Sequence, residues 1–412
     1  MSQHRACVIV GAGLAAAHAV ETLRADGWSD PIVLIGEEDE RPYERPGLSK
    51  GVLLGQDEAE TLFVHEEHWY AEHDVTTRFG ERVERIDREA REVVLASGER
   101  IAYAALVLAT GARPRLLDIP GADLAGVLTL RRMGDSAAIA AELVPGRRVV
   151  LVGAGWIGLE VAAAARLAGA DVTVLEYAAQ PLLRVLGDRL ARHVAAMHRA
   201  HGVDLRTGVG VTAVEGAEGH VTGVRVGDGV GGDDEVVPAD VVIVGVGAAP
   251  ATELAEGAGL PVDNGIVVDT HLRTSDPAIW AAGDVANALN ATLGPLRVEH
   301  WDNAIRQGKL VAASILGRDG GYDWQPYFYT DQYELGMEYV GRGSGDDEVV
   351  SRGDLREGDA TSAFIAFWQR EGRVTAAMQA NVWDTIDDLR ALIGRVIPAE
   401  RLRDEAIALS DL

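Results

Sequence analysis

Short apolar runs alternate with amphipathic stretches along the chain, and the same order of elements occurs twice. Strand, helix and strand are predicted at Cys7–Val10, Ala15–Asp26 and Ile32–Ile35, and again at Val149–Val152, Gly158–Leu167 and Val172–Leu175. A glycine-containing turn joins the first strand to the helix in both copies. Each copy is a βαβ unit with short connections, which favours a right-handed crossover and a parallel sheet.

The later parts of the two copies also correspond. Val93–Gly111 predicts a hairpin, with its turn at Ser97-Gly98, followed by the apolar strand Leu106–Ala109. Val224–Gly247 repeats this plan with a longer turn at Gly227–Asp234 and the strand Val241–Val244. The chain therefore predicts two similar nucleotide-binding folds.

After Gly247 the pattern returns to a strand and a helix, at Ile279–Ala281 and Asn303–Leu316, and a turn-like stretch follows at Gly317–Gly321. Beyond it, a hairpin is predicted at Ala363–Trp368 and Val374–Ala380, then an amphipathic helix over Thr385–Ile393 with Asp384 as its N-cap. The predicted fold class is α/β, with two nested Rossmann-like dinucleotide-binding domains and a small α+β C-terminal domain. The first domain takes residues 1–115 and 247–321, the second 116–246, and the third 322–412.

Composition and charge narrow the possible partners and locations. The 412 residues are 47% hydrophobic and 25% charged, the balance of a chain that buries real cores. No apolar run reaches the roughly 18 residues that a membrane span needs. The N-terminus enters a strand without the features of a signal peptide, so a cytoplasmic location is expected. The net charge of −26 argues against nucleic acid or an anionic membrane as a partner.

The cysteine and histidine content argues against a disulfide and a metal site, and the lysine content marks two positions. Cys7 is the only cysteine and lies in the apolar run Ala6–Val10, so we expect a buried small hydrophobe and no disulfide. The histidines are scattered without ligand spacing, so no metal site is expected. Lysine occurs only at Lys50 and Lys309, which makes each position of interest.

Both glycine turns satisfy a dinucleotide-binding pattern. They read Gly11-Ala12-Gly13-Leu14-Ala15-Ala16 and Gly153-Ala154-Gly155-Trp156-Ile157-Gly158. The first glycine permits the tight turn, the second lets the backbone approach a pyrophosphate, and the third small residue lets helix and strand pack closely. The helix N-terminus then meets the phosphate charge. Such turns also occur in purely structural loops, so their context decides the interpretation.

That context is an acid at the end of the following strand in each copy, Glu37 and Glu176. Either acid alone would be read as a solvated strand end. After a glycine turn, each is placed to accept hydrogen bonds from a ribose 2′-hydroxyl. Glu176 would repel a 2′-phosphate, and no arginine follows within Tyr177–Gln180 to receive one, so NADH is favoured over NADPH.

Three further motifs carry a resemblance to a known family. They are the stretch Arg41-Pro42-Tyr43-Glu44-Arg45-Pro46-Gly47-Leu48-Ser49-Lys50, the segment Thr110-Gly111-Ala112-Arg113-Pro114, and the segment Trp280-Ala281-Ala282-Gly283-Asp284. Over nearly its whole length the chain resembles the NADH-dependent ferredoxin reductases of oxygenase and cytochrome P450 systems. These are glutathione-reductase-like flavoproteins that bind FAD non-covalently. Gly47 stands where many relatives have proline.

The resemblance implies roles for individual residues. The first glycine turn, through Gly11, Gly13, Leu14 and Ala15, would hold FAD together with Glu37, Arg45, Lys50, Val83, Thr110, Gly111, Arg131, Asp284 and Trp301. The second, through Gly153, Gly155, Trp156 and Ile157, would hold NADH together with Glu160, Glu176 and Gly247. Asp284 could instead cap a helix, and Trp301 could belong to core packing.

Lys50 and Glu160 are the residues that the resemblance places at the reacting atoms. Lys50 would approach the flavin N5 edge, and Glu160 would lie beside the nicotinamide and pair with it. A glutamate at position 160 could also serve as a cap in the first turn of its helix, where the helix dipole stabilises negative charge. The sequence alone leaves both readings open.

Missing residues define how electrons leave. A disulfide-reducing cysteine pair is absent, and the last histidine is His300, so no C-terminal acid–base histidine exists. The implied mechanism is hydride transfer from NADH to FAD and then two single-electron steps to an iron–sulfur ferredoxin. Alternatives are a rubredoxin or small-molecule reductase and a redox sensor like apoptosis-inducing factor.

The sequence says less about the ferredoxin partner and the oligomeric state than about the cofactors. A basic patch at Arg297, Arg306, Lys309 and Arg318 could offset the net charge toward an acidic ferredoxin, although a solvated helix face explains these residues equally well. We expect a monomer or a weak homodimer.

Overall fold

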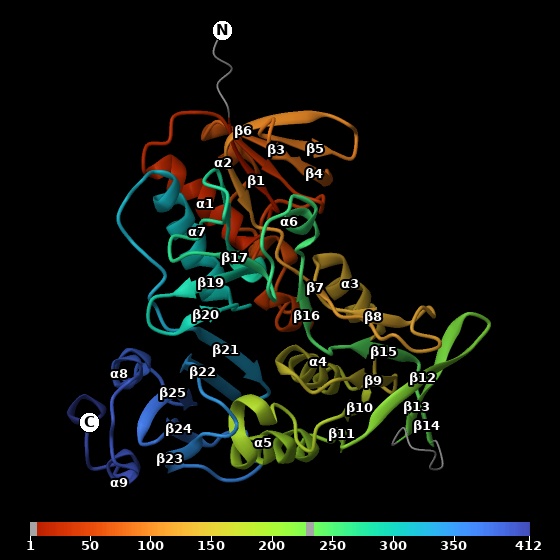
Figure 1. The fold of residues 1–412 in the computed structure, drawn as a ribbon. Helices are drawn as coiled ribbons and strands as arrows, with labels where there is room; N and C mark the ends of the chain where they lie inside the picture. The colour runs from red at the N-terminus through yellow and green to blue at the C-terminus, as the bar shows by residue number, and fades with distance from the viewer. Residues whose placement is uncertain (1–5, 228–234) are drawn as a thin grey trace. The chain divides into compact units, whose positions relative to one another are not determined.

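The structure is a computed structural model that describes residues 6–227 and 235–412. The chain forms two compact units (Figure 1). Unit 1 contains the N-terminal stretch up to Arg45, Ala59–Arg113 and Ala248–Pro326; unit 2 contains Pro46–Glu58, Pro114–Gly247 and Tyr327–Leu412. The predicted turn at Gly227–Asp234 lies outside the described residues except for Gly227. The three-domain division stays a prediction.

Unit 1 is built on a seven-stranded sheet in the order β3-β2-β1-β6-β5-β4, with β18 paired to β6. Its parallel strands are β1 (Ala6–Val10), β2 (Ile32–Ile35), β3 (Val75–Arg78), β6 (Arg100–Leu108) and β18 (Ile279–Ala281). The antiparallel extension is β4 (Val83–Asp87) and β5 (Glu92–Leu95). The predicted hairpin strand and the apolar strand after it are therefore one continuous strand, β6.

Two long helices pack together in unit 1. They are α1 (Leu14–Ala25) and α7 (Trp301–Ile315), drawn red and teal in Figure 1. A side chain at Gly308 of α7 would clash with the carbonyl oxygen of Ala15, so glycine is needed where the helices meet. The remaining elements are α2 (Glu67–Glu72), α6 (Glu253–Gly257), β7 (Ala112–Pro114), β16 (Ala248–Pro250), β17 (Ile266–Val268), β19 (Ala286–Asn290) and β20 (Gly294–Leu296).

Unit 2 contains the second nucleotide fold. Its five-stranded parallel sheet has the order β11-β10-β9-β15-β8, from β8 (Val127–Thr129), β9 (Arg148–Val152), β10 (Asp171–Glu176), β11 (Asp204–Thr207) and β15 (Val241–Val244). The helices are α3 (Met133–Glu142), α4 (Trp156–Leu167) and α5 (Leu183–Ala200). A three-stranded sheet joins β12 (Gly210–Ala217), β13 (His220–Gly227) and β14 (Glu235–Pro238).

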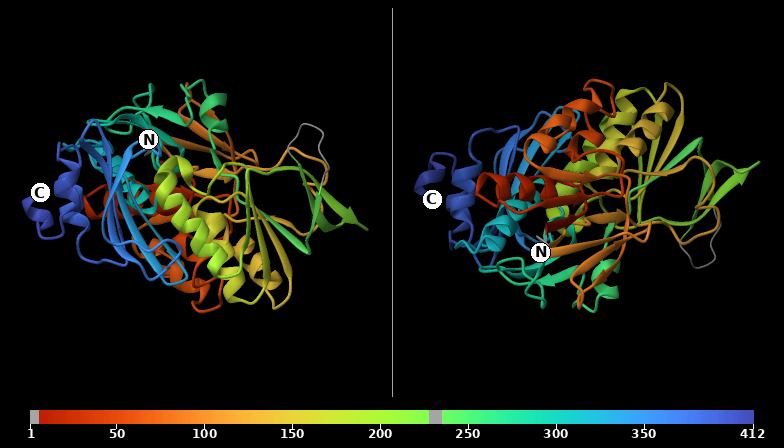
Figure 2. Two further views of the ribbon diagram at one scale, coloured as in Figure 1. Left: turned by 90° about the horizontal axis from the view of Figure 1, so that it is seen from below. Right: turned by 90° about the horizontal axis from the view of Figure 1, so that it is seen from above.

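The C-terminal part of unit 2 is an antiparallel sheet in the order β21-β22-β25-β24-β23 (Figure 2). Its strands are β21 (Tyr327–Gln332), β22 (Leu335–Gly341), β23 (Glu348–Asp354), β24 (Ala363–Arg370) and β25 (Arg373–Ala380). Successive residues of β24, from Phe364 to Trp368, are buried, and because alternate side chains point to opposite sides, both faces of the sheet are covered. Trp368 belongs to the core that includes α5, whereas Phe367 belongs to the core with α8 (Ile386–Leu392) and α9 (Ala399–Arg403).

Two local predictions are wrong. Asp384 is not the N-cap of α8: it has a left-handed backbone with φ of 61°, and Thr385 takes the cap position. The helix after the second glycine turn begins at Trp156 and not at Gly158, because Gly155 already occupies the N-cap. In the described part of the chain, no helix is long and apolar enough to cross a membrane.

Candidate functional site

The first glycine turn in unit 1 joins β1 to α1. Gly11 has φ of 103°, and a side chain there would clash with the carbonyl oxygen of Ala109 at the end of β6. Gly13 is the N-cap of α1 and offers no side-chain oxygen, and the first turn of the helix carries no acid. A Cβ on Gly13 would meet no atom within 4 Å. Open space at an uncapped helix N-terminus fits a pyrophosphate.

The other FAD motifs of unit 1 meet the same turn. Gly283 has φ of 79°, and a Cβ there would lie 3.1 Å from the Cβ of Ala15. Gln307 of α7 accepts the Gly283 N–H at 2.8 Å and so fixes the segment that carries Asp284. The Thr110 hydroxyl donates to the Ala251 carbonyl at 2.7 Å beside Gly111, whose φ is 69°. The structure thus brings together three motifs that are far apart in sequence.

Arg45 is held by two side chains of unit 1. Its guanidinium donates to Glu38 and to the Tyr43 hydroxyl, both at 2.8 Å, and the Tyr43 hydroxyl donates to Glu38 at 2.5 Å. Burial lowers the pKa of Arg45, but Tyr43, Glu38 and Asp284 together raise it above its ordinary value. Arg45 is therefore a fixed cation near Asp284 and suits an anionic or polar cofactor group.

The remaining unit 1 predictions occupy different settings. The Glu37 side chain is 45% exposed and lies 3.9 Å from Arg113, so its carboxylate is open to a ribose hydroxyl. Val83 is buried at the start of β4 and can contribute only its backbone. Trp301 is the first residue of α7. Their contact with a cofactor stays a prediction.

The second glycine turn in unit 2 repeats the geometry of the first. Gly153 has φ of 99°, and Gly155 is the N-cap of α4 with no acid in the first turn. A Cβ on Gly155 would meet only the Gly245 carbonyl oxygen, at 3.9 Å. Ile157 in the first turn is 49% exposed, and Gly247 has φ of 98°. This turn also fits a pyrophosphate.

Glu176 at the end of β10 is tied to that turn. Its two carboxylate oxygens accept the backbone N–H groups of Ala154 and Ala178, each at 2.7 Å. The carboxylate therefore fixes the turn, and each oxygen keeps a further lone pair for a ribose hydroxyl. Tyr177 beside it is 83% exposed.

Lys50 and Glu160 form an ion pair within unit 2. The Lys50 Nζ donates to the Glu160 Oε1 at 2.5 Å, and the two side chains are 18% and 6% exposed. The Lys50 Nζ also lies 5.4 Å from the centre of the Tyr329 ring. The pairing implied by the resemblance is therefore present across 110 positions of sequence.

Neighbouring elements place the two partners. Lys50 follows the short 3-10 helix η1 (Pro46–Ser49), which is held to α3 by a hydrogen bond from the Ser136 hydroxyl to the Leu48 carbonyl at 2.8 Å. Glu160 lies beyond the first turn of α4, because the helix begins at Trp156. The alternative of a dipole-stabilised cap is thus wrong, and side chains stabilise the carboxylate instead. The backbone N–H of Arg131 donates to Asp135 at 2.9 Å before α3.

Sequence reasoning missed two further partners of Glu160. The Ser49 hydroxyl donates to Oε2 and the Thr330 hydroxyl donates to Oε1, both at 2.5 Å. Ser49 lies inside a motif that was recognised for its neighbours. Thr330 lies in β21, where nothing in the local sequence distinguishes it from an ordinary strand threonine.

Cys7 is fully buried in β1, and burial raises the pKa of its thiol to about 12. A thiol of this kind stays protonated at neutral pH and is a poor nucleophile. Among the described residues, no group of three or more histidine, cysteine and acidic side chains could hold a metal ion.

The predicted basic patch is largely compensated by acids of unit 1. Arg297 pairs with Glu299, Arg306 pairs with Asp302 at 2.8 Å, and Arg318 pairs with Asp26 at 2.8 Å. Lys309 is exposed on α7. These pairs reduce the local positive field that the sequence suggested.

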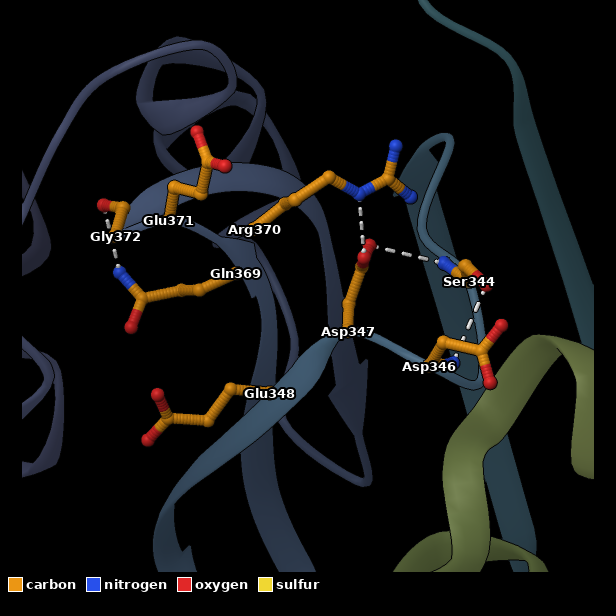
Figure 3. A pocket seen from close by; sticks show the side chains of 8 residues that line it. All are labelled: Ser344, Asp346, Asp347, Glu348, Gln369, Arg370, Glu371 and Gly372. Carbon is orange, nitrogen blue, oxygen red and sulfur yellow. Dashed lines mark hydrogen bonds and ion pairs between the residues drawn. The ribbon is translucent and has the colours of Figure 1, made fainter.

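A surface hollow in the C-terminal sheet of unit 2 is lined mainly by polar and acidic residues (Figure 3). Asp347 is buried there, and its carboxylate accepts hydrogen bonds from Arg370 Nε at 2.9 Å and from the Thr375 hydroxyl at 2.8 Å. These bonds attach the loop between β22 and β23 to β24 and β25. They satisfy the carboxylate and indicate a structural role.

Two family models match the chain. The pyridine nucleotide-disulphide oxidoreductase model matches residues 5–308, and the reductase C-terminal model matches residues 327–412. Together they cover both glycine turns and the sheet that carries Thr330.

Full-length relatives are similar to the chain. A ferredoxin–NAD(+) reductase component of an anthranilate 1,2-dioxygenase system from Burkholderia cepacia is 41% identical, over 98% of both chains. Putidaredoxin reductase from Pseudomonas putida is 37% identical over 98% of this chain and 96% of its own. In the crystal structure of the covalent putidaredoxin reductase–putidaredoxin complex, the matched chain superimposes with a TM-score of 0.92 at 36% identity, covering 98% of this chain and 97% of that chain.

Proposed function

The chain belongs to the pyridine nucleotide-disulphide oxidoreductases, among the ferredoxin reductases of oxygenase systems, and from this premise we propose that it is an FAD-dependent NADH:ferredoxin oxidoreductase. It takes hydride from NADH and supplies single electrons to an iron–sulfur ferredoxin, which serves a cytochrome P450 or ring-hydroxylating oxygenase. The observation that carries the proposal is the buried Lys50–Glu160 pair in unit 2, in which Glu160 belongs to α4, the helix that follows the second glycine turn.

The residues of unit 1 fit FAD. The turn at Gly11–Ala15 would hold the pyrophosphate, Glu37 the adenosine ribose, and Asp284 a ribityl hydroxyl. Arg45 supplies a fixed positive charge close to Asp284. When bound, FAD accepts two electrons at once and releases them one at a time, which suits a carrier that takes single electrons.

The residues of unit 2 fit NADH. The turn at Gly153–Ile157 would receive the pyrophosphate, and Glu176 would accept the ribose hydroxyls. Because the carboxylate already accepts two backbone N–H groups, it is fixed in place at that edge. A 2′-phosphate would therefore meet fixed like charge, which favours NADH over NADPH.

Lys50 and Glu160 orient the reacting groups. Glu160 is held by three donors, two on Oε1 and one on Oε2, so one lone pair of Oε2 remains that could accept from the nicotinamide amide. Lys50 is slightly exposed and carries a positive charge that can stabilise electron density arriving nearby. Both groups act by position and charge, and neither needs to transfer a proton to do so.

Electrons leave without a thiol intermediate. The only cysteine is Cys7, whose protonated, fully buried thiol cannot form a redox pair. This supports a direct outlet to a protein carrier and argues against disulfide or peroxide reduction. A cytoplasmic location, where NADH is available, is part of the proposal.

Two measurements test the proposal. Stopped-flow mixing with NADH should bleach the flavin rapidly, and NADPH should do so far more slowly. Steady-state assays should then show NADH-dependent reduction of an iron–sulfur ferredoxin from the same organism. Fast reduction of a dye without reduction of any such ferredoxin would contradict the proposed outlet and support a small-molecule reductase. Flavin reduction that takes minutes would support a redox sensor.

A further inference from the structure

A row of buried polar side chains continues from Glu160 into the core of unit 2. The Thr330 hydroxyl donates to Glu160 at 2.5 Å, the Gln332 Nε2 donates to Thr330 at 3.2 Å, and the His198 Nε2 lies 2.8 Å from the Gln332 Oε1. Tyr333 lies at the far end, with its hydroxyl 3.5 Å from the His198 Nδ1. Thr330, Gln332 and His198 are 1%, 2% and 0% exposed.

The chemistry of these groups fixes the direction of every bond. An ionised carboxylate only accepts, so Thr330 must donate to Glu160. The Thr330 oxygen then accepts from Gln332, and this requires the amide nitrogen to face it. The amide oxygen consequently faces His198, whose Nε2 must carry a proton. The Nδ1 of neutral His198 is then an acceptor, facing the Tyr333 hydroxyl.

All donors in the row therefore point toward Glu160. Hydrogen bonds aligned in one direction polarise one another and strengthen the last bond, here the bond to the carboxylate. Burial lowers the pKa of His198 to about 4, so the ring is neutral at pH 7 and keeps the single tautomer that the row requires. Burying these three polar side chains costs desolvation free energy, but because each is hydrogen-bonded, their geometry is fixed.

We propose that Thr330, Gln332 and His198 are positioning residues that hold the Glu160 carboxylate in one orientation against Lys50. The inference rests on the proposed function, because the geometry at Glu160 matters for hydride transfer from NADH. None of the three needs to touch either nucleotide. Their effect passes through the Glu160 Oε1, where the bonds from Thr330 and Lys50 converge.

Substitutions at Thr330 separate positioning from stability. Thr330→Val keeps the volume but removes the donor, whereas Thr330→Ser keeps the donor. Thr375→Val is the matched control, because the hydroxyl of Thr375, in β25 of the same sheet, also donates to a buried carboxylate, that of Asp347, which lies outside the row. All three variants are compared with the unmodified FAD-loaded protein.

Thr330→Val should lower the limiting rate of flavin reduction by NADH roughly tenfold, the effect of losing one charge-assisted hydrogen bond in the transition state. The dissociation constant for NADH should change by less than about twofold, since the nucleotide contacts are intact. Thr330→Ser should restore the rate, and Thr375→Val should leave it unchanged. An unchanged rate in Thr330→Val, or equal slowing in Thr375→Val, would overturn the inference.

A second readout does not depend on turnover. With ¹⁵N-labelled histidine in the FAD-loaded protein, the His198 signals are assigned by their loss in His198→Gln. The ring should be neutral at pH 7 with the proton on Nε2; a proton on Nδ1, or a doubly protonated ring, would overturn the inference. If NADH fails to reduce even the unmodified protein, the proposed function is wrong, and the tautomer still decides whether the row exists as described.

Discussion

Replacing Lys50 by methionine should destabilise unit 2 and slow flavin reduction, and the two effects can be separated. The change removes the charged donor to Glu160 while keeping most of the aliphatic stem. The carboxylate is only 6% exposed, so it cannot replace the lost partner with bulk water. It keeps the donors Ser49 and Thr330, which moderate the loss.

The magnitude follows from this asymmetry. Breaking a buried ion pair by removing one partner costs about 3–5 kcal/mol. With two hydroxyl donors remaining, we expect about 2–3 kcal/mol, which lowers the unfolding temperature by roughly 4–12 °C for a unit of this size. Glu160→Gln should cost less, about 1 kcal/mol, because Lys50 is 18% exposed and can turn toward water. The double variant leaves no unpaired charge, so it should be more stable than Lys50→Met alone.

The assay is thermal unfolding of the FAD-loaded proteins, together with stopped-flow reduction by NADH. Lys309→Met is the matched control, because it removes the other lysine of the chain from an exposed site on α7. It should change neither quantity. In the double variant the unfolding temperature should recover while the rate stays low. Additive losses of stability in the double variant would refute the buried-charge reasoning.

Three further outcomes follow from the contacts of single residues. Glu176→Ala should weaken NADH binding by roughly 10- to 100-fold in a titration, because it removes the ribose acceptor and the hydrogen bond to the Ala154 N–H. The FAD content should stay unchanged. Faster turnover with NADPH than with NADH in the unmodified protein would show that the cofactor assignment is wrong. Cys7 should resist thiol reagents until the protein unfolds, and Cys7→Ala should retain full activity; rapid labelling of the native protein would contradict a thiol whose pKa is raised to about 12. His198 has a pKa lowered by burial to about 4 from an ordinary 6.5, so the unfolded chain binds more protons between these values and the free energy of unfolding should fall by roughly 3 kcal/mol as pH drops from 7 to 4. His198→Gln should lose that part of the pH dependence in urea titrations, and an identical slope would contradict it.

The parts of the site that could be predicted from sequence are those with local physical causes. Gly11 and Gly153 have a positive φ and lie close to other chain segments, so only glycine fits there. The turns can therefore be recognised from the spacing of their glycines. Glu37 lies two residues beyond β2 and Glu176 is the last residue of β10, so each acid could be recognised by its place after a glycine turn. The βαβ units were predicted because apolar strands and amphipathic helices have different periods.

The row of Thr330, Gln332 and His198 behind Glu160 could not be predicted, because these residues are distant from one another or from Glu160 in the chain. Thr330 is 170 positions away, and Gln332 lies 134 positions from His198. Threonine and glutamine are usually exposed and histidine is intermediate, so the burial of these three side chains could be recognised only from the folded arrangement of the sheet and α5. The start of α4 was misplaced for a related reason: Gly155 serves as the N-cap without any side-chain signal.

The stretch from Arg41 to Lys50 reads as one motif, yet its two ends have different attachments. Arg45 is fixed by Glu38 and Tyr43 in unit 1, whereas the residues after it join unit 2, where Lys50 pairs with Glu160. A single run of sequence thus supplies a fixed cation to one nucleotide fold and an ion-pair partner to the other. Because Arg45 bonds to Glu38 and Tyr43 whereas Lys50 bonds to Glu160, we expect substitutions at the two ends of the motif to have different effects. Substitution of Arg45 should lower the FAD content, whereas substitution of Lys50 should slow flavin reduction by NADH while FAD is retained.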